Sequence, residues 1–162
     1  MLVARMGAQV TLTDYHPVVL SRLRANITLN GLDAAASVEC LDWGASRAGD
    51  RARFRLLIGA DLAFAERSAA LLARTAQELM RDDDARVFVY AHQERRAIYM
   101  GSDGEVKREP TDSGLDALLA SVAPLQSRQI HARTTADGER VSLLAIGAPE
   151  VIQRVPALSR VS

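Results

Sequence analysis

The sequence has little cysteine, few aromatic residues and no net charge. Its single cysteine, Cys40, excludes an internal disulfide and a zinc site built from several cysteines. Equal numbers of basic and acidic residues, 20 of each, argue against a protein held mainly by nucleic-acid phosphates or anionic lipid. No apolar run approaches the roughly 20 residues that a membrane helix needs, and residues 1–6 show no secretory signal. We therefore expect a protein of a reducing compartment, the cytoplasm or alternatively the nucleus, with no nucleic-acid or membrane partner.

Length and composition are those of one globular domain. The 162 residues are 48% hydrophobic and 25% charged, which is enough apolar side chain to close a single core. Residues 149–162 contain two prolines and show no periodic pattern. We predict one domain over residues 1–148, followed by a tail over residues 149–162.

Strand and helix patterns alternate along the chain. Runs of β-branched and apolar residues predict strands at 8–13, 36–41, 54–59, 86–91, 126–132 and 140–146. Helical spacing predicts helices at 17–30, 66–81 and 115–122, the last capped by Asp112 or Ser113. Asp137-Gly138 predicts a hairpin between the last two strands, and the polar segment 99–114 predicts a long loop. This order is typical of an α/β sheet that is mostly parallel, with an antiparallel edge.

Acidic residues follow three of the predicted strands. Asp14, Asp42 and Asp61 each stand just after an apolar run, and ligands of parallel α/β sheets bind outside the carboxyl ends of the strands. A carboxylate at such a position accepts hydrogen bonds from ribose hydroxyls. Trp43, the only tryptophan, follows Asp42 and offers an apolar surface to an adenine ring; core packing is its alternative role. The pattern indicates a nucleoside pocket.

No phosphate-binding motif accompanies this pocket. None of the ten glycines forms a G-x-G pair, and no P-loop pattern is present. A dinucleotide or a nucleoside triphosphate therefore has no support, and a generic nucleotide-binding domain is disfavoured. A nucleoside ligand without phosphates fits what remains, and S-adenosylmethionine is such a ligand.

The remaining reactive side chains have plainer interpretations. The three histidines are too dispersed for a metal site, so we expect no metal and interpret each histidine as a surface or turn residue. Cys40 is interpreted as a small core residue, Arg95-Arg96 as a solvated helix start and the three aspartates at 82–84 as a solvated turn. The histidines are His16, His92 and His131.

Four segments together resemble a known enzyme family. They are residues 7–15 (Gly-Ala-Gln-Val-Thr-Leu-Thr-Asp-Tyr), Pro17 with Leu20 and the helix end at 26–30, the run Leu-Asp-Trp-Gly at 41–44, and the run Ile-Gly-Ala-Asp-Leu-Ala-Phe at 58–64. In this combination they are similar to the methyltransferase-like protein-lysine methyltransferases, whose members act on calmodulin, elongation factors and chaperones. The resemblance is close over residues 1–96, moderate through the terminal hairpin and weak in the segment 99–114.

The resemblance implies a Rossmann-like seven-strand methyltransferase sheet with an antiparallel C-terminal hairpin, S-adenosylmethionine as cofactor and a protein lysine as substrate. Asp61 and Phe64 match the family's Asp-x-x-Tyr/Phe motif at the methyl-transfer site, and Asp61 is the candidate for orienting the amine. Phe64 has no hydroxyl, so a role that needs a tyrosine O–H does not carry over. The implied cofactor residues are Asp14 at the ribose, Tyr15 covering it or simply packing, Asp42 and Trp43 beside the adenine, and Ala60 along the methionine part.

The family pattern begins before residue 1. In the family a first strand and its glycine-rich turn come earlier, and that strand lies between the strands that here end at Asp14 and Asp61. We therefore expect an N-terminally truncated sheet in which these two strands lack a neighbour or pair with each other. A catalytically inert domain of the same fold, acting through protein contacts, remains the alternative to an active methyltransferase.

Overall fold

The computed structural model describes residues 1–45, 54–80 and 86–157, and the chain divides into two compact units. The first unit, Met1–Ala45, contains a parallel pair of strands in register from Val10↔Ala36 to Asp14↔Cys40. Its elements are α1 (Leu2–Arg5), β1 (Val10–Asp14), α2 (Pro17–Leu29) and β2 (Ala36–Cys40). The elements β1, α2 and β2 were predicted, with boundaries within two residues.

Local signals explain where α2 begins and ends. Its N-cap is His16, whose Nδ1 accepts a hydrogen bond from the amide of Val18 at 3.3 Å, and Pro17 occupies the first turn. The helix stops at Asn30, and the next residue, Gly31, has a φ of 62° that a side chain would disfavour. The buried face of α2 contributes Ile27 to a small core of this unit.

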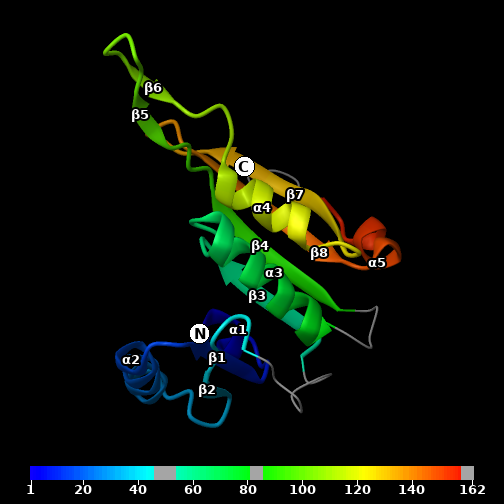
Figure 1. The fold of residues 1–162 in the computed structure, drawn as a ribbon. Helices are drawn as coiled ribbons and strands as arrows, with labels where there is room; N and C mark the ends of the chain where they lie inside the picture. The colour runs from blue at the N-terminus through cyan, green and yellow to red at the C-terminus, as the bar shows by residue number, and fades with distance from the viewer. Residues whose placement is uncertain (46–53, 81–85, 158–162) are drawn as a thin grey trace. The chain divides into compact units, whose positions relative to one another are not determined.

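The second unit, Ser46–Ser162, is built on a mixed four-stranded sheet in the order β3-β4-β8-β7 (Figure 1). The pair β3–β4 is parallel, and β8 is antiparallel to both β4 and β7. The elements are β3 (Leu56–Ala60), α3 (Glu66–Met80), β4 (Val87–Gln93), β5 (Ile98–Met100), β6 (Val106–Arg108), α4 (Ser113–Ser121), β7 (Gln126–Thr134), β8 (Arg140–Gly147) and α5 (Pro149–Arg154).

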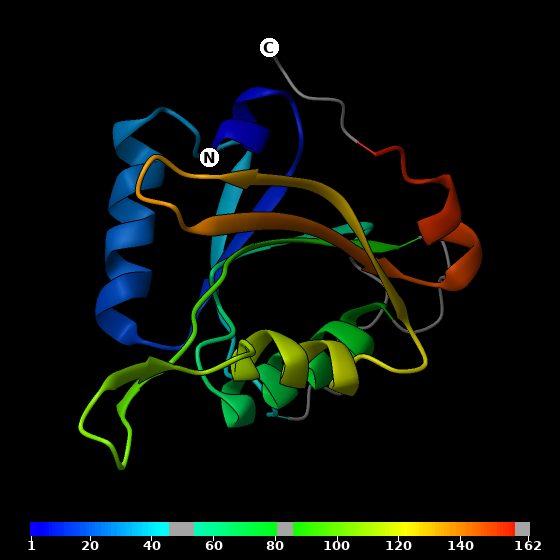
Figure 2. The ribbon, with the colours of Figure 1, turned by 90° about the horizontal axis from the view of Figure 1, so that it is seen from above.

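Helices α3 and α4 lie side by side against one face of this sheet (Figure 2). Strand β4 turns Phe88, Tyr90 and His92 toward that face, and all three are buried, whereas the residues between them are half-buried. Strand β4 is therefore fully buried on one face and half-buried on the other. Side chains alternate between the two faces of a strand, so Tyr90 and His92 lie on the same face as Phe88. These two polar residues are buried for that reason.

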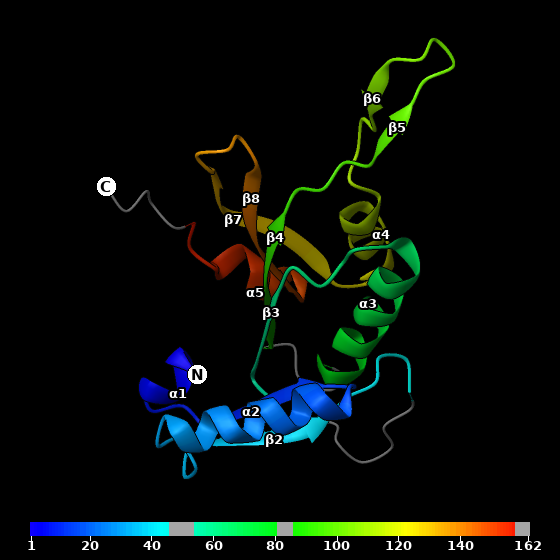
Figure 3. The ribbon, with the colours of Figure 1, turned by 90° about the vertical axis from the view of Figure 1, so that its left-hand side faces the viewer.

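Three parts of the second unit differ from the sequence prediction. The segment predicted as a loop contains the antiparallel hairpin β5–β6, which projects away from the four-stranded sheet (Figure 3). Arg95-Arg96 lies between β4 and β5, with no helix there. The predicted tail begins with α5, whose Ile152 packs against Ile130 and Ala145. The hairpin and α5 were missed because each is too short to show a period.

Strands β1 and β3 each pair on one side only among the residues that the structure describes. Within residues 1–45, 54–80 and 86–157, β1 pairs only with β2 and β3 pairs only with β4. Leu56 and Ile58 of β3 expose about half of their surface, at 48% and 59%. In the same described ranges no helix combines the length and the apolar character needed to cross a bilayer.

Helix α4 is capped by a buried carboxylate. Of the two predicted caps, Asp112 is the one used, since its Oδ1 accepts a hydrogen bond from the amide of Leu115 at 2.9 Å. Burial acts to raise the pKa of Asp112, but hydrogen bonds from the amides of Leu115 and Arg95 and from the imidazole of His92 outweigh it. The pKa of Asp112 therefore lies below the ordinary aspartate value of 3.8.

This shift predicts how Asp112→Asn changes acid stability. A carboxyl whose pKa is lower in the folded chain than in the unfolded chain stabilises the fold above the unfolded pKa, and that contribution disappears as pH falls through the folded pKa. We expect Asp112→Asn to lower the free energy of unfolding by about 2 kcal/mol at pH 7. The deficit should shrink below pH 3.8. Denaturant melts from pH 7 to pH 2 measure it, with the exposed Asp116→Asn as control; a deficit independent of pH contradicts the prediction.

Candidate functional site

The carboxyl end of β1 presents the first acidic candidate. Asp14 is half-buried and lies opposite Cys40 in the strand register, and its carbonyl accepts a hydrogen bond from the amide of Leu41 at 2.9 Å. Its Oδ1 accepts from the amide of His16 at 2.8 Å. Oδ2 has no hydrogen-bond partner among the residues that the structure describes. Asp14 thus offers one carboxylate oxygen, on a rigid strand end, to a polar ligand.

Three further predicted residues surround this strand end. Tyr15 follows Asp14 and is 66% exposed, and its ring lies edge-on to that of His16 at a centroid distance of 6.1 Å. Asp42 is exposed and Trp43 is half-buried, in a turn closed by a 3.2 Å bond from the amide of Ala45 to the carbonyl of Asp42. The sequence prediction that these side chains follow neighbouring strand ends is confirmed by the register of β1 and β2.

The carboxyl end of β3 presents a second group, in the other unit. Ala60 is the last residue of β3, and the amide of Asp61 continues the strand pairing with a 2.8 Å bond to the carbonyl of Ala91. Asp61 has a φ of 54°, the left-handed region, which is uncommon for a residue with a side chain. Such a conformation costs roughly 1–3 kcal/mol and persists only where the surrounding structure holds it.

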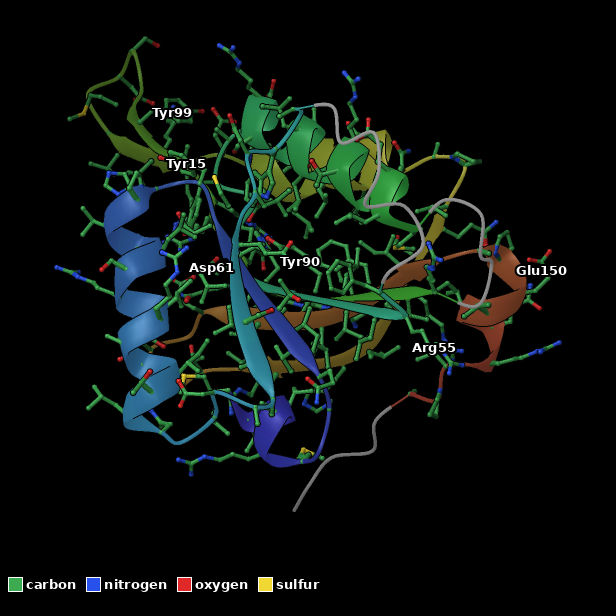
Figure 4. The ribbon with its side chains drawn as sticks, turned by 90° about the horizontal axis from the view of Figure 1, so that it is seen from below. Tyr15, Arg55, Asp61, Tyr90, Tyr99 and Glu150 are labelled. Atoms are coloured by element: carbon green, nitrogen blue, oxygen red, sulfur yellow. The ribbon has the colours of Figure 1, made fainter. Side chains whose placement is uncertain are left out.

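A tyrosine hydroxyl from β4 holds the loop that follows Asp61. The Tyr90 hydroxyl accepts hydrogen bonds from the amides of Leu62 at 3.0 Å and Ala63 at 2.9 Å. Figure 4 shows Asp61 and Tyr90 in this region. Burial raises the pKa of Tyr90 above the ordinary 10.0, against the opposing effect of the two amide donors. The phenol therefore remains protonated at neutral pH.

Asp61 is paired with an arginine that the sequence interpretation placed in solvent. Arg95 Nε lies 3.3 Å from Asp61 Oδ1, and Arg95 Nη2 contacts Asp61 Oδ2, so the pair is bidentate. The guanidinium carbon of Arg95 lies 4.9 Å from the ring centroid of Phe64, which is 62% exposed. The hydrogen bond that Arg95 donates to the Asp61 carboxylate raises the pKa of Arg95. The loop thus displays a carboxylate whose charge is compensated, beside an aromatic face.

Two interpretations of reactive residues were wrong. His92 is not a surface residue: it is 1% exposed and bonds both Tyr90 and Asp112. Cys40 is not in a core but exposed at the end of β2. The alternation of β4 carried a signal for His92, because Phe88, Tyr90 and His92 occupy one side of a strand. No sequence signal pointed to the pairing of Arg95 with Asp61, since 34 residues separate them.

The described residues contain no metal centre. Across residues 1–45, 54–80 and 86–157, no three histidine, cysteine, aspartate or glutamate side chains come together as ligands. The aspartates at 82–84, interpreted as a solvated turn, lie outside the described residues.

The candidate residues form two groups, one at the end of each parallel pair. The first unit holds Asp14, Tyr15, Asp42 and Trp43, and the second holds Ala60, Asp61 and Phe64.

Solved structures share this fold. The CcbJ methyltransferase of Streptomyces caelestis matches with a TM-score of 0.60 and 14% identity, over 90% of this chain and 77% of that chain. The PH0226 protein of Pyrococcus horikoshii matches with a TM-score of 0.64 and 9% identity, over 91% and 74%. The glycopeptide N-methyltransferase MtfA, in complex with S-adenosylmethionine, gives a TM-score of 0.57 and 12% identity, over 91% and 75%. At these identities the likeness shows the fold.

The sequence also matches a model of one protein family. The model described as lysine methyltransferase matches residues 1–101, more than half of the chain, and this segment includes every candidate site residue. Together with the shared fold, the match confirms the predicted Rossmann-like α/β class and S-adenosylmethionine-dependent methyl transfer as the activity class. The chain belongs to the lysine methyltransferase family.

Proposed function

We propose that this protein transfers a methyl group from S-adenosylmethionine to the ε-amine of a lysine in a protein substrate. The observation that carries the proposal is the lysine methyltransferase match over residues 1–101, because that segment holds both groups of candidate residues. The structure supports it with a half-buried carboxylate at the end of β1 and a charge-compensated carboxylate at the end of β3.

The end of β1 fits the nucleoside part of the cofactor. In this proposal the unshared Oδ2 of Asp14 accepts from ribose hydroxyls, as strand-end carboxylates do in Rossmann-like sheets. The exposed ring of Tyr15 covers the sugar, and Asp42 and Trp43 bind the adenine by its amine and its face. The family resemblance assigns Ala60, exposed at the end of β3, to the methionine part. When bound, the cofactor supplies an electrophilic methyl group on a sulfonium.

The end of β3 fits the lysine amine. Methyl transfer needs a neutral amine, which forms the new N–C bond as the methyl–sulfur bond breaks; the sulfur keeps the bonding pair, and the methylated ammonium then releases a proton. A lone carboxylate would favour the ammonium form. Because Arg95 compensates the charge of Asp61, the pair can accept an amine N–H without stabilising protonation. Phe64 contributes an apolar face beside this position.

Cofactor binding tests the first group of residues. We expect S-adenosylhomocysteine to bind the purified chain in a calorimetric titration and Asp14→Ala to weaken binding at least tenfold. A hydrogen bond to a charged group contributes roughly 1.5–3 kcal/mol, and 1.4 kcal/mol corresponds to about a factor of ten. Asp33→Ala removes an exposed carboxylate of the same unit and should leave the affinity unchanged. Absence of binding by the folded wild-type chain would favour the catalytically inert alternative.

Product identity tests the activity itself. The chain is incubated with S-adenosylmethionine carrying a deuterated methyl group and with a protein extract, and the digested proteins are examined by mass spectrometry. We expect the labelled methyl group on lysine ε-nitrogen, and loss of at least nine-tenths of the label with Asp61→Ala. Label on arginine, histidine or a small molecule would contradict the lysine assignment, and full labelling by Asp61→Ala would remove Asp61 from the site.

Charge compensation by Arg95 predicts a shift in the pH profile. Arg95→Ala leaves the Asp61 carboxylate uncompensated, so the substrate amine holds its proton to higher pH. We expect kcat/KM at pH 7.5 to fall about tenfold, the effect of roughly one pKa unit, and to recover as pH rises. Arg96→Ala is the matched control, because Arg96 pairs with Glu94 and not with Asp61. Equal loss at every pH would show that Arg95 does not act through the charge on the amine.

A further inference from the structure

Three buried polar side chains form one hydrogen-bonded chain beneath the Asp61 loop. The Tyr90 hydroxyl lies 3.0 Å from His92 Nδ1, and His92 Nε2 lies 2.8 Å from Asp112 Oδ2. Tyr90, His92 and Asp112 are 0%, 1% and 6% exposed. No sequence motif of the family resemblance includes these residues, and the predicted site did not contain them.

The number of hydrogen bonds that each group can donate and accept determines the donor and the acceptor of every bond in this hydrogen-bonded chain. A phenolic oxygen has two lone pairs, and the amides of Leu62 and Ala63 occupy both on Tyr90. The Tyr90 hydroxyl must therefore donate its proton, and among the described residues the acceptor in contact with it is Nδ1 of His92. His92 is consequently the neutral tautomer with its proton on Nε2, which donates to the Asp112 carboxylate.

Both ends of this hydrogen-bonded chain of side chains contact residues that hold Asp61 in place. At one end, the Leu62 and Ala63 amides follow the left-handed Asp61 directly, so the Tyr90 hydroxyl holds the backbone conformation of this residue. At the other end, Asp112 accepts from the amide of Arg95, whose side chain pairs with the Asp61 carboxylate. The first turn of α4 also closes on the loop, because a Cβ at Gly114 would meet the carbonyl oxygen of Ala63 at 2.2 Å.

We infer that Tyr90, His92 and Asp112 are positioning residues for methyl transfer: the chain of fixed direction that they form holds the Asp61 backbone and aims the Asp61–Arg95 pair at the amine. The inference rests on the proposed function of Asp61. An apolar side chain in place of Tyr90 would leave the part-buried Leu62 amide and the buried Ala63 amide without this acceptor. The polar chain thus serves the loop that carries Asp61.

Tyr90→Phe separates positioning from general stability. The variant keeps the ring in the core and removes only the oxygen; Tyr99→Phe, a half-exposed tyrosine of β5, is the matched control. We expect Tyr90→Phe to bind S-adenosylhomocysteine within threefold of wild type. With a peptide containing the lysine that the labelling experiment identifies, kcat should fall at least tenfold and KM should change less than threefold. A folded Tyr90→Phe protein whose kcat is within twofold of wild type overturns the inference.

A second measurement does not depend on turnover or on the variant's folding. In wild-type protein with ¹⁵N-labelled histidine, we expect the His92 imidazole at pH 7 to carry one proton, on Nε2, and none on Nδ1. An imidazolium, or a proton on Nδ1, overturns the inference. Absence of methyl transfer by the wild-type chain, with the Nε2–H tautomer observed, would contradict the proposed function and leave the hydrogen-bonded chain established.

Discussion

The loop that carries Asp61 is held by one hydroxyl group that accepts hydrogen bonds from two adjacent backbone amides. Tyr90 comes from the interior of β4, and its oxygen reaches Leu62 and Ala63 in the loop after β3. Those two bonds tie the end of one strand to the centre of its parallel neighbour, where regular pairing has stopped. They also hold the left-handed Asp61 in a conformation that an unconstrained aspartate would leave. The loop can therefore present a side chain in a fixed direction although it belongs to no helix or strand.

Electrostatics gives this loop its chemical character. A carboxylate next to a lysine would hold the amine protonated, which opposes nucleophilic attack. In the proposed reaction Arg95 removes that obstacle, because it pairs with both oxygens of Asp61; Phe64 lies against the guanidinium. The first unit contributes a different chemistry, a carboxylate with one unshared oxygen beside exposed aromatic surface at the end of β1. Each parallel pair thus ends in an acidic residue, with a distinct proposed task.

Sequence patterns predicted the parts of this chain whose signals are local. The ends of α2 were predicted from Pro17 and Gly31, and the β7–β8 hairpin was predicted from Asp137-Gly138. Asp14 and Asp61 were recognised because each follows an apolar run. The partners of the site were missed because they are long-range: Arg95 meets Asp61 across 34 residues, and Asp112 meets His92 across 20. Contacts between residues so far apart in the sequence leave no periodic pattern from which they could be predicted. His92 was interpreted as a surface residue because the three histidines are dispersed in the sequence, whereas its burial depends on two partners that the fold supplies.

The proposed role of Tyr90 depends on the two amides that donate to its hydroxyl, so the hydrogen exchange of these amides is the most direct test. Both belong to a loop, and loop amides ordinarily exchange with solvent quickly. We predict that the Leu62 and Ala63 amides of the wild-type chain exchange as slowly as amides inside β4, because each donates to a buried oxygen. Fast exchange at both positions in the folded protein would show that Tyr90 does not hold the loop and would contradict the account.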